Sequence, residues 1–443
     1  MNRIFNFYFI IIIFISNNYK AMFRNIETYD EENTSLIEIT TYEKEYEKKE
    51  VTGEEVSTNT EITEPFTILL LGIDSTDDGI GDASSYNGDA IMLLAVDPAT
   101  LHVTMFSIPR DTYVPISCNN NLESKITHSG WNGEKCVIST IENWMDIKID
   151  YYVKVNFTAV VNLVDEIGGI EIDIPYNFCE QDSNRRWKEY TVYVEKGLQN
   201  LNGEQALAYS RNRHPNPICG AKWSNYNSND LIRGEHQQIV LNAILNKAVK
   251  NLSLDKLKNI LNIIGKNVDT NMNINTMTSY YNVLKTIALD KDNVLNFERL
   301  TLSTYGKSLY DPLLNMYGMS MQIYYKDSFD KIVKEMKINL GLDEPEIIKT
   351  LSFSVNNPYK ESIIGKGTYY QKDIEVVPNF KGKDLSVAQT WANNNGISLT
   401  VEYKSTTDEE NNTIISQSIN STYRVDKITS PLKIVVAKND LIE

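Results

Sequence analysis

Three short apolar runs near the start of the ordered part of this chain constrain its fold more than any other feature. They are TILLLGID (67–74), AIMLLAVD (90–97) and VTMFSI (103–108), and turn residues separate them. A strand with one exposed face alternates apolar and polar residues, whereas these runs are apolar almost throughout. The pattern predicts strands that are buried on both faces.

Helical patterns follow the strands. Residues 136–145, 157–167 and 230–251 carry apolar residues at helical spacing, and Asp230 is a candidate N-cap of the last helix. Strands that alternate with helices predict an α/β domain, with helices on both faces of a central sheet.

The N-terminal residues 1–20 contain an apolar stretch at positions 4–16. This stretch is short for a membrane-spanning helix and suits the core of a signal peptide, but no small-residue cleavage site follows it. We favour a signal anchor over a cleaved signal peptide and over a buried strand. Either signal predicts the extracytoplasmic face of the cell membrane, or secretion to the cell wall.

Residues 21–64 have no apolar period, and positions 25–64 hold 13 acidic residues against 3 lysines, which is −10 of the chain's net charge of −16. This composition predicts a disordered stalk; a marginal charged helix is the alternative. Because most of the net negative charge lies in one segment, the low overall pI does not exclude an anionic substrate. The chain has no basic tract that would predict a nucleic-acid partner.

The remaining sequence predicts a main domain over residues 65–340, a linker over 341–374 and a small separate domain over 375–439. Asp384 is a candidate cap for a helix in the small domain, which two or three strands follow.

The four cysteines are even in number and lie in a chain predicted to be exported, which favours disulfides. The sequence alone permits three pairings. Because it closes the shortest loop, we favour Cys118–Cys136, which leaves Cys179–Cys219. Buried free thiols remain the alternative.

Charged residues follow two of the predicted strands. The first run ends at Asp74, the third continues into Arg110 and Asp111, and Asp89 lies just before the second. In open α/β sheets, ligands bind beyond the carboxyl ends of the strands. These side chains are therefore candidates for a ligand site, although strand-end aspartates more often form turns.

A second charged group lies in LNGEQALAYSRNRHP (201–215), where Arg211 and Arg213 alternate and would share a face of an extended segment. Guanidinium groups suit phosphate oxygens. Arg233 and Gln237 follow at helical i, i+4 spacing. The four histidines are scattered and no nucleophile motif is present, so the sequence does not support a histidine-based hydrolase.

The order of these motifs is more specific than any one of them. LLLGID, GDAIMLLAVDP, VTMFSIPRDTYVPI, SKITHSGWNG, GLQNLNGEQALAYSRNR and NDLIRGEHQQ occur in sequence over residues 66–250 and strongly resemble the LytR-CpsA-Psr family. The resemblance implies a central mixed sheet with a hydrophobic lipid tunnel. It also implies a membrane-anchored enzyme that transfers a glycopolymer from a polyprenyl-pyrophosphate carrier to peptidoglycan and releases polyprenyl phosphate.

The resemblance also assigns roles to individual residues. Asp74 and Asp89 resemble the carboxylates that hold a magnesium ion. Arg110, Arg211 and Arg213 resemble the pyrophosphate clamp, Lys125 a further basic residue, and Gln237 a polar phosphate partner. Asp230 resembles the carboxylate beside the attacking hydroxyl, and we interpret Asp111 as orienting Arg110. Arg233 is a further candidate for substrate binding.

Three positions depart from the family pattern. Thr76, Asn87 and His236 stand where members often carry arginine. His236 could restore a positive charge at mildly acidic pH, or serve only as a polar residue on a helix face. These departures keep two alternatives open: an inactive binder or scaffold in cell-wall assembly, and a pyrophosphatase that acts on the same lipid.

The small domain reads VVPNFKGKDLSVAQTWANNNGISLTVEY from residue 376 and resembles a single PASTA domain. PASTA domains often bind peptidoglycan, and many act as spacers. Both functions remain open for this copy, and both fit the compartment that the first domain implies.

Overall fold

A computed structural model describes residues 64–73, 85–100, 102–251, 265–272, 296–345 and 363–438. The predicted signal segment 1–20 and the predicted stalk, apart from residue 64, lie outside the described residues. The chain divides into two compact units: unit 1 comprises residues 1–108, 148–301 and 334–364, and unit 2 comprises 109–147, 302–333 and 365–443.

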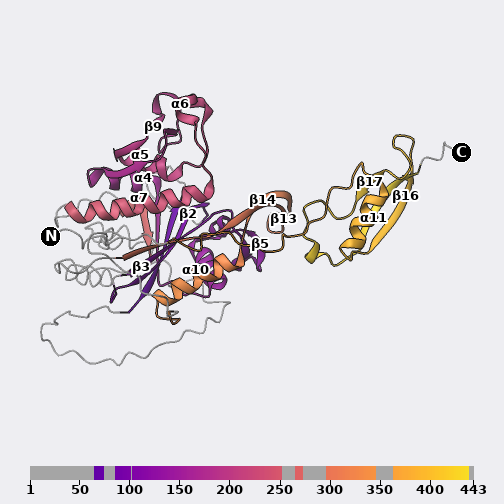
Figure 1. Ribbon diagram of the computed structural model, residues 1–443, viewed down its shortest axis with the longest axis horizontal. Helices are drawn as coiled ribbons and strands as arrows, with labels where there is room; N and C mark the ends of the chain where they lie inside the picture. The colour runs from indigo at the N-terminus through magenta and orange to yellow at the C-terminus, as the bar shows by residue number, and fades with distance from the viewer. Residues whose placement is uncertain are drawn as a thin grey trace. The chain divides into compact units, whose positions relative to one another are not determined.

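Unit 1 is built on a mixed seven-stranded sheet (Figure 1). In spatial order its strands are β11 (Val268–Thr270), β6 (Tyr151–Asn156), β1 (Phe66–Ile73), β2 (Gly88–Asp97), β3 (His102–Ile108), β12 (Asn296–Thr301) and β15 (Ile363–Ile364). The strands β1, β2 and β3 form an antiparallel meander, whereas β6 pairs in parallel with β1 and β12 in parallel with β3. The predicted linker contributes its residues 363–364 to this sheet as the edge strand β15.

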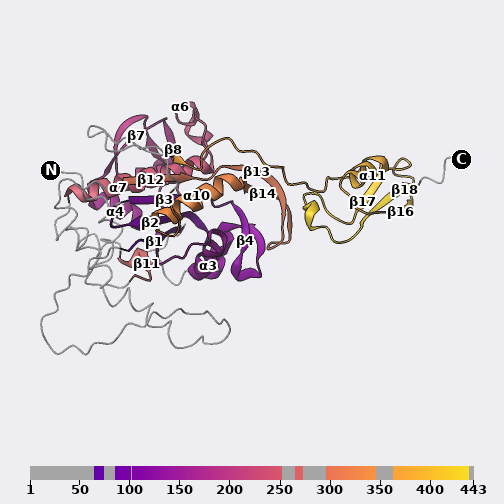
Figure 2. The same ribbon diagram turned by 60° about the horizontal axis from the view of Figure 1, so that its bottom comes forward.

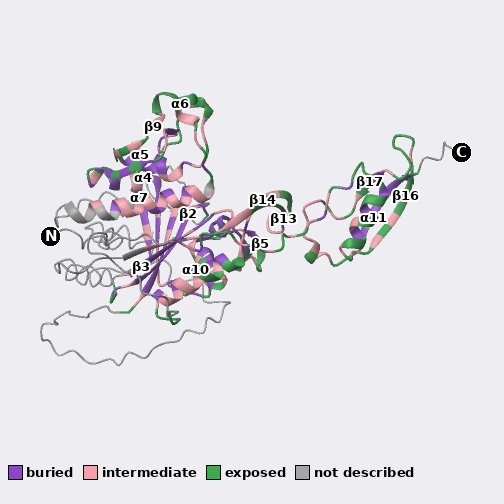
Figure 3. Ribbon diagram, in the orientation of Figure 1, coloured by how far each residue is buried: buried purple, intermediate pink, exposed green. Residues whose placement is uncertain are grey.

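Consecutive residues of β1 to β3 are buried, as the continuous apolar runs predict (Figure 3). Both faces of the sheet are therefore covered. Figures 1 and 2 show α4 (Phe157–Glu166), α5 (Gly203–Arg211) and α7 (Asp230–Asn251) on one side. On the other side, Asn339 at the end of α10 (Lys326–Asn339) donates its amide to the carbonyl oxygens of Ala95 and His102.

Close helix packing at two points depends on glycine. A Cβ on Gly203 would overlap the Val161 carbonyl of α4, and a Cβ on Gly234 would lie 2.9 Å from Ser107 Oγ on β3. These contacts bring α5 against α4 and α7 against the sheet.

The remaining elements of unit 1 are small. Two antiparallel pairs join β7 (Ile170–Ile174) to β10 (Gly197–Leu201), and β8 (Phe178–Glu180) to β9 (Val192–Val194). One short helix, α6 (Ala221–Ser224), and 3-10 turns at η3 (Lys188–Tyr190), η4 (Pro217–Cys219) and η5 (Gly265–Asn267) complete the described part.

Unit 2 contains two hairpins and a helix. The hairpins are β4 (Tyr113–Ile116) with β5 (Leu122–Lys125), and β13 (Thr304–Asp311) with β14 (Met316–Tyr324). The turn η1 (Ser117–Asn119) connects β4 to β5, and η2 (Ile126–Asn132) and α3 (Gly133–Met145) follow β5. Trp144 of α3 stacks on Phe329 at 4.5 Å between ring centroids, which ties α3 to the start of α10.

The C-terminal part of unit 2 packs α11 (Leu385–Asn394) on a sheet of β16 (Leu399–Ser405), β18 (Leu432–Lys438) and β17 (Ile414–Gln417). Its core includes Phe380, Ala388 and Ile434. Asp384 caps α11 by accepting a hydrogen bond from the Ser386 backbone N–H at 2.8 Å, as predicted. The short turn η6 (Val425–Lys427) precedes β18.

Two local expectations were wrong. The N-cap of α7 is Asn229, whose Oδ1 accepts hydrogen bonds from the N–H groups of Leu231 and Ile232. The run before Arg211 is the helix α5 and not an extended segment, because Asn202 and Gln205 form a capping box that starts a helix there. Within the described ranges, no helix is both long and apolar enough to cross a membrane.

Candidate functional site

The pairing of the strands brings one end each of β1, β2 and β3 to the same edge of the unit 1 sheet. Ile73 at the end of β1 pairs with Gly88 at the start of β2, and Ile91 of β2 pairs with Ile108 at the end of β3. Asp89 therefore lies at the edge where β1 and β3 end. The sequence argument about strand ends is correct for this edge, although β2 reaches it with its amino end.

The predicted magnesium ligands can be followed only in part. Asp89 is half-buried, whereas Asp74 lies outside the described residues. Ile73, which is bonded to Asp74, pairs with Gly88, which is bonded to Asp89. No three His, Cys, Asp or Glu side chains within the described ranges lie close enough to hold a metal together. The described carboxylate at this edge, that of Asp89, suits magnesium chemically, because that ion keeps several waters and is often held by one or two carboxylates plus substrate phosphates.

Arg211, the last residue of α5, is a half-buried cation. Its Nη1 donates to the Asp182 carbonyl oxygen at 3.1 Å, and its Cζ lies 4.6 Å from the centroid of the Phe157 ring. Burial lowers the pKa of Arg211, which nearby Glu180 and Asp89 partly counteract. Among the described residues, no carboxylate oxygen lies at ion-pair distance from this guanidinium. A desolvated guanidinium in this state is suited to bind an anion.

Two further residues join this group, and sequence reasoning missed both. Burial raises the pKa of Glu180 at the end of β8, against the attraction of Arg211 and Arg213. Burial lowers the pKa of Arg185, and the like charge of Arg211 lowers it further. The positive charges of Arg211 and Arg213 thus both lower the pKa of Glu180, although the two arginines do not lie on one extended segment. The sequence did not reveal Glu180 and Arg185, because they lie far from Arg211 along the chain and no motif connects them to α5.

An aromatic cluster supports the end of α5. Tyr209 stacks on His236 of α7 at 4.0 Å, and Tyr176 stacks on Tyr226 at 4.3 Å. Asn212 Nδ2 donates to Tyr226 Oη at 2.7 Å. His236 is 4% exposed, and burial lowers its pKa to about 4. His236 is therefore neutral at mildly acidic pH and does not replace the missing arginine there.

The other candidates on α7 have different environments. Arg233 is buried, with 6% of its surface exposed, and Gln237 is half-buried. Gln237 Nε2 donates to the Ser210 carbonyl oxygen at 3.4 Å, which links α7 to α5. Asp230 is the first residue of α7, and its side chain lies outside the described part.

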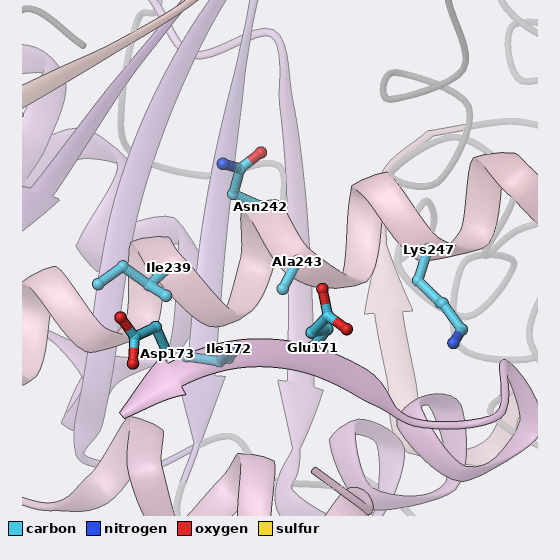
Figure 4. Close-up of a pocket in the computed structure, with 7 residues that line it drawn as sticks. All are labelled: Glu171, Ile172, Asp173, Ile239, Asn242, Ala243 and Lys247. Carbon is cyan, nitrogen blue, oxygen red and sulfur yellow. The ribbon is translucent and has the colours of Figure 1, made fainter. Parts of the chain in front are cut away.

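A pocket of about 460 Å³ lies between β7 and α7 of unit 1 (Figure 4). Ile172, Ile239 and Ala243 give it an apolar side, and four polar side chains complete the lining: Glu171, Asp173, Asn242 and Lys247. This mixed lining differs from the hydrophobic tunnel that the resemblance implies, so the tunnel stays a prediction.

Unit 2 carries the remaining predicted site residues. Asp111 and Lys125 form an ion pair of 2.8 Å between Oδ1 and Nζ. Backbone bonds fix the segment: the Arg110 carbonyl accepts from Thr127 N–H at 3.1 Å, and the Asp111 carbonyl from Gln322 N–H at 2.9 Å. Asp111 therefore orients Lys125, a role that the sequence analysis did not assign to it.

A buried polar network next to this segment was also missed. Ser124 Oγ lies 2.6 Å from both His128 Nδ1 and Asp311 Oδ2, and Asp311 is fully buried. Burial lowers the pKa of His128, and Asp311 raises it. Because Ser124 is also fully buried, the network holds β5, η2 and β13 together and offers no exposed nucleophile.

Both favoured cysteine pairs are disulfide-bonded in the structure. Cys118–Cys136 closes 18 residues within unit 2, and Cys179–Cys219 closes 40 residues within unit 1. The second bond joins β8, which carries Glu180, to the segment after Arg213.

Comparisons with known proteins agree with this architecture. The model of the LytR_cpsA_psr (LytR-CpsA-Psr) family matches residues 31–338, and that of the PASTA domain matches residues 375–438. An uncharacterized protein of Staphylococcus aureus is 35% identical over 247 residues, which cover 53% of this chain and 56% of that protein. The polyisoprenyl-teichoic acid–peptidoglycan teichoic acid transferase TagU of Enterococcus faecalis is 30% identical over 283 residues, 63% of this chain and 80% of that protein.

A solved structure supports the fold. The crystal structure of a Streptococcus agalactiae protein is 26% identical, has a TM-score of 0.52, and its match covers 67% of this chain and 94% of that one. The chain spans little more than half of the length of the S. aureus relative. The family match alone covers more than half of this chain and includes every predicted site residue. The chain therefore belongs to the LytR-CpsA-Psr family and carries a C-terminal PASTA domain.

Proposed function

We propose that this protein transfers a glycopolymer from a polyprenyl-pyrophosphate carrier to peptidoglycan, at the extracytoplasmic face of the membrane. The observation that carries the proposal is Arg211, a desolvated cation with no carboxylate at ion-pair distance among the described residues. The E. faecalis relative is named as a transferase of teichoic acid between a polyisoprenyl-linked donor and peptidoglycan, which supports the proposal. A membrane anchor in residues 1–20 is part of the proposal.

The proposed reaction is a phosphoryl transfer. A hydroxyl oxygen of the acceptor glycan attacks the phosphorus that carries the saccharide, and the bond from this phosphorus to the bridging oxygen breaks. A phosphodiester-linked saccharide forms and polyprenyl phosphate leaves. Arg211 and Arg213 bind the diphosphate oxygens and stabilise the charge that develops on them. Arg233 and Gln237 are further contacts for the substrate.

Four further residues complete the proposed machinery. Arg110 contacts phosphate oxygens, and Lys125, oriented by Asp111, adds a second positive charge in unit 2. Asp230 accepts the proton of the attacking hydroxyl.

We also propose that Asp74 and Asp89 hold a magnesium ion. When bound, the ion supplies positive charge beside the diphosphate. Asp89→Asn should weaken magnesium binding measured by calorimetry in the absence of substrate. Unchanged binding in this variant would exclude Asp89 as a ligand.

The test of the function uses a polyprenyl-pyrophosphate saccharide, a peptidoglycan oligomer and magnesium, with products detected by mass spectrometry. We expect a phosphodiester-linked saccharide on the glycan, lost in Arg110→Ala, Asp89→Ala and with chelator. Release of phosphate without acceptor would instead indicate a pyrophosphatase. Lipid binding without any product would indicate a scaffold, and the neutral His236 would then be the first cause to examine.

A further inference from the structure

Unit 2 contains a second pocket, of about 220 Å³, that the proposed transfer does not use. Three parts of the chain line it. The β4–β5 hairpin supplies Tyr113, Asn121 and Glu123, β13 supplies Tyr310, and the PASTA domain supplies Tyr423 and Lys427.

Hydrogen bonds hold the walls of this pocket together. The Thr422 carbonyl oxygen accepts from Tyr310 N–H at 2.9 Å, and Thr422 Oγ1 accepts from Gly318 N–H at 2.9 Å. Arg424 donates to both carboxylate oxygens of Glu123 at 3.0 and 3.1 Å. These bonds join the PASTA domain to both hairpins of unit 2. The pocket is formed by the two hairpins and the PASTA domain together.

The pocket presents flat aromatic surface. The rings of Tyr310 and Tyr423 lie 5.3 Å apart, and Tyr310 also contacts Tyr317 at 4.5 Å. Tyrosine combines a rigid apolar face with a polar hydroxyl, which suits a ligand that has both C–H faces and hydroxyl groups.

The polar groups of the pocket narrow the ligand class. Arg424 is engaged by Glu123 and by Asp426, so it serves as a structural link. Lys427 has 52% of its side chain exposed and forms a long ion pair of 3.7 Å between its Nζ and Glu123 Oε2. Asn121 is exposed in a left-handed turn and offers an amide. Together they provide a cation for a carboxylate and an amide for an acylamino group.

We propose that this composite pocket binds a saccharide of acylated amino sugars that carries carboxylate groups, the chemistry of a peptidoglycan strand. The choice of this glycan rests on the proposed function, whereas the saccharide class follows from the pocket. Six of its nine lining residues lie outside the PASTA match. The PASTA domain therefore supplies only one wall of the pocket.

The test measures binding to the full chain by calorimetry, without lipid donor. The probes are a tetrasaccharide of alternating N-acetylglucosamine and N-acetylmuramic acid, and chitotetraose, which lacks carboxylates. We expect Tyr310→Ala and Tyr423→Ala to weaken binding of the first probe by about tenfold or more. Lys427→Gln should remove the preference for the first probe over chitotetraose.

Two further variants keep the test sharp. Asn121→Gly deletes the amide but retains the left-handed turn (φ 55°), so it stays informative if a tyrosine variant fails to fold; we expect a several-fold loss. Tyr403→Ala is the matched control, because Tyr403 lies on β16 with 59% exposure and does not line the pocket.

Equal affinity in the native chain, Asn121→Gly and the folded tyrosine variants would overturn the inference, as would an equal loss in Tyr403→Ala. Because no donor is present, the result is independent of transfer. A chain that binds through this pocket but transfers nothing would keep the inference and contradict the proposed function.

Discussion

Arg211 in unit 1 and Lys125 in unit 2 are both half-buried cations that the family resemblance links to phosphate binding, yet their charges are balanced differently. Lys125 forms a direct 2.8 Å ion pair with Asp111. Arg211 has only a backbone carbonyl as a hydrogen-bond acceptor among the described residues, while carboxylates act on it from a greater distance.

This difference separates two uses of positive charge. A cation in a direct ion pair is fixed in place, but much of its charge is already neutralised. A desolvated cation without a close carboxylate keeps most of its attraction for an incoming anion. We infer that Arg211 contributes more to anion binding than Lys125, whose charge Asp111 partly neutralises.

The largest expected effect is the loss of Arg211. Arg211→Ala should lower the rate of glycopolymer transfer about a thousandfold, because a charge-assisted contact to the transition state disappears. Arg186→Ala is the matched control. Arg186 is a nearby exposed arginine that already pairs with Asp182 at 2.6 Å, so the variant should retain nearly full activity. Similar losses in both variants would remove the distinction between paired and unpaired arginines.

The two disulfides extend the comparison to stability. The free energy of unfolding should fall by about 4 kcal/mol in the double variant Cys179→Ser/Cys219→Ser and by about 3 kcal/mol in Cys118→Ser/Cys136→Ser, because the longer loop restricts the unfolded chain more. Urea denaturation of the variants measures both values. A larger cost for the shorter loop would show that native-state contacts outweigh loop entropy.

His236 should make unit 1 sensitive to acid. Its folded pKa of about 4 lies below the value of 6.5 for an unfolded histidine, so its stabilising contribution is complete above pH 6.5 and declines as pH falls toward 4. Relative to His236→Phe, which keeps the ring stack on Tyr209 but does not titrate, the native protein should lose about 3 kcal/mol between pH 7 and pH 4. Denaturant unfolding measures the free energy of unfolding of both proteins across this pH range. An equal change with pH in the two proteins would contradict the prediction.

The smallest expected effect concerns the ion pair of unit 2. Asp111→Asn and Lys125→Met should each reduce transfer by roughly tenfold at most, because the pair is partly solvent-screened. The double variant should be no worse than either single variant, since the residues act as a unit. The exposed pair Lys222–Glu195 is the control, and Lys222→Met should change nothing. Additive losses would show that Lys125 binds the substrate independently of Asp111.

The sequence predicted the parts of the fold that depend on local pattern. Continuous apolar runs identified the buried strands β1 to β3, and Asp384 was correctly identified as a helix cap. Asp230 was wrongly chosen as a cap because Asn229, equally suited to that role, precedes it. The helix α5 was missed because an alternation of two arginines was weighed above a capping box.

The site residues that the sequence did not reveal depend on long-range contacts. Glu180 and Arg185 act on Arg211 from segments that precede it by more than twenty positions. The Ser124–His128–Asp311 network joins residues 187 positions apart. Burial also decided the protonation state of His236, and the sequence could only offer that residue's ordinary pKa.

The strand β5 has a consequence for how this family member can vary. Three consecutive residues serve three different partners: Glu123 binds Arg424, Ser124 joins the buried network, and Lys125 pairs with Asp111. Neighbouring residues of a strand point to opposite faces, so deletion of Leu122, which precedes the three, would turn all three side chains away from their partners at once. Homologues that keep this arrangement should therefore tolerate insertions and deletions in the turn at 117–121 and none within 122–125.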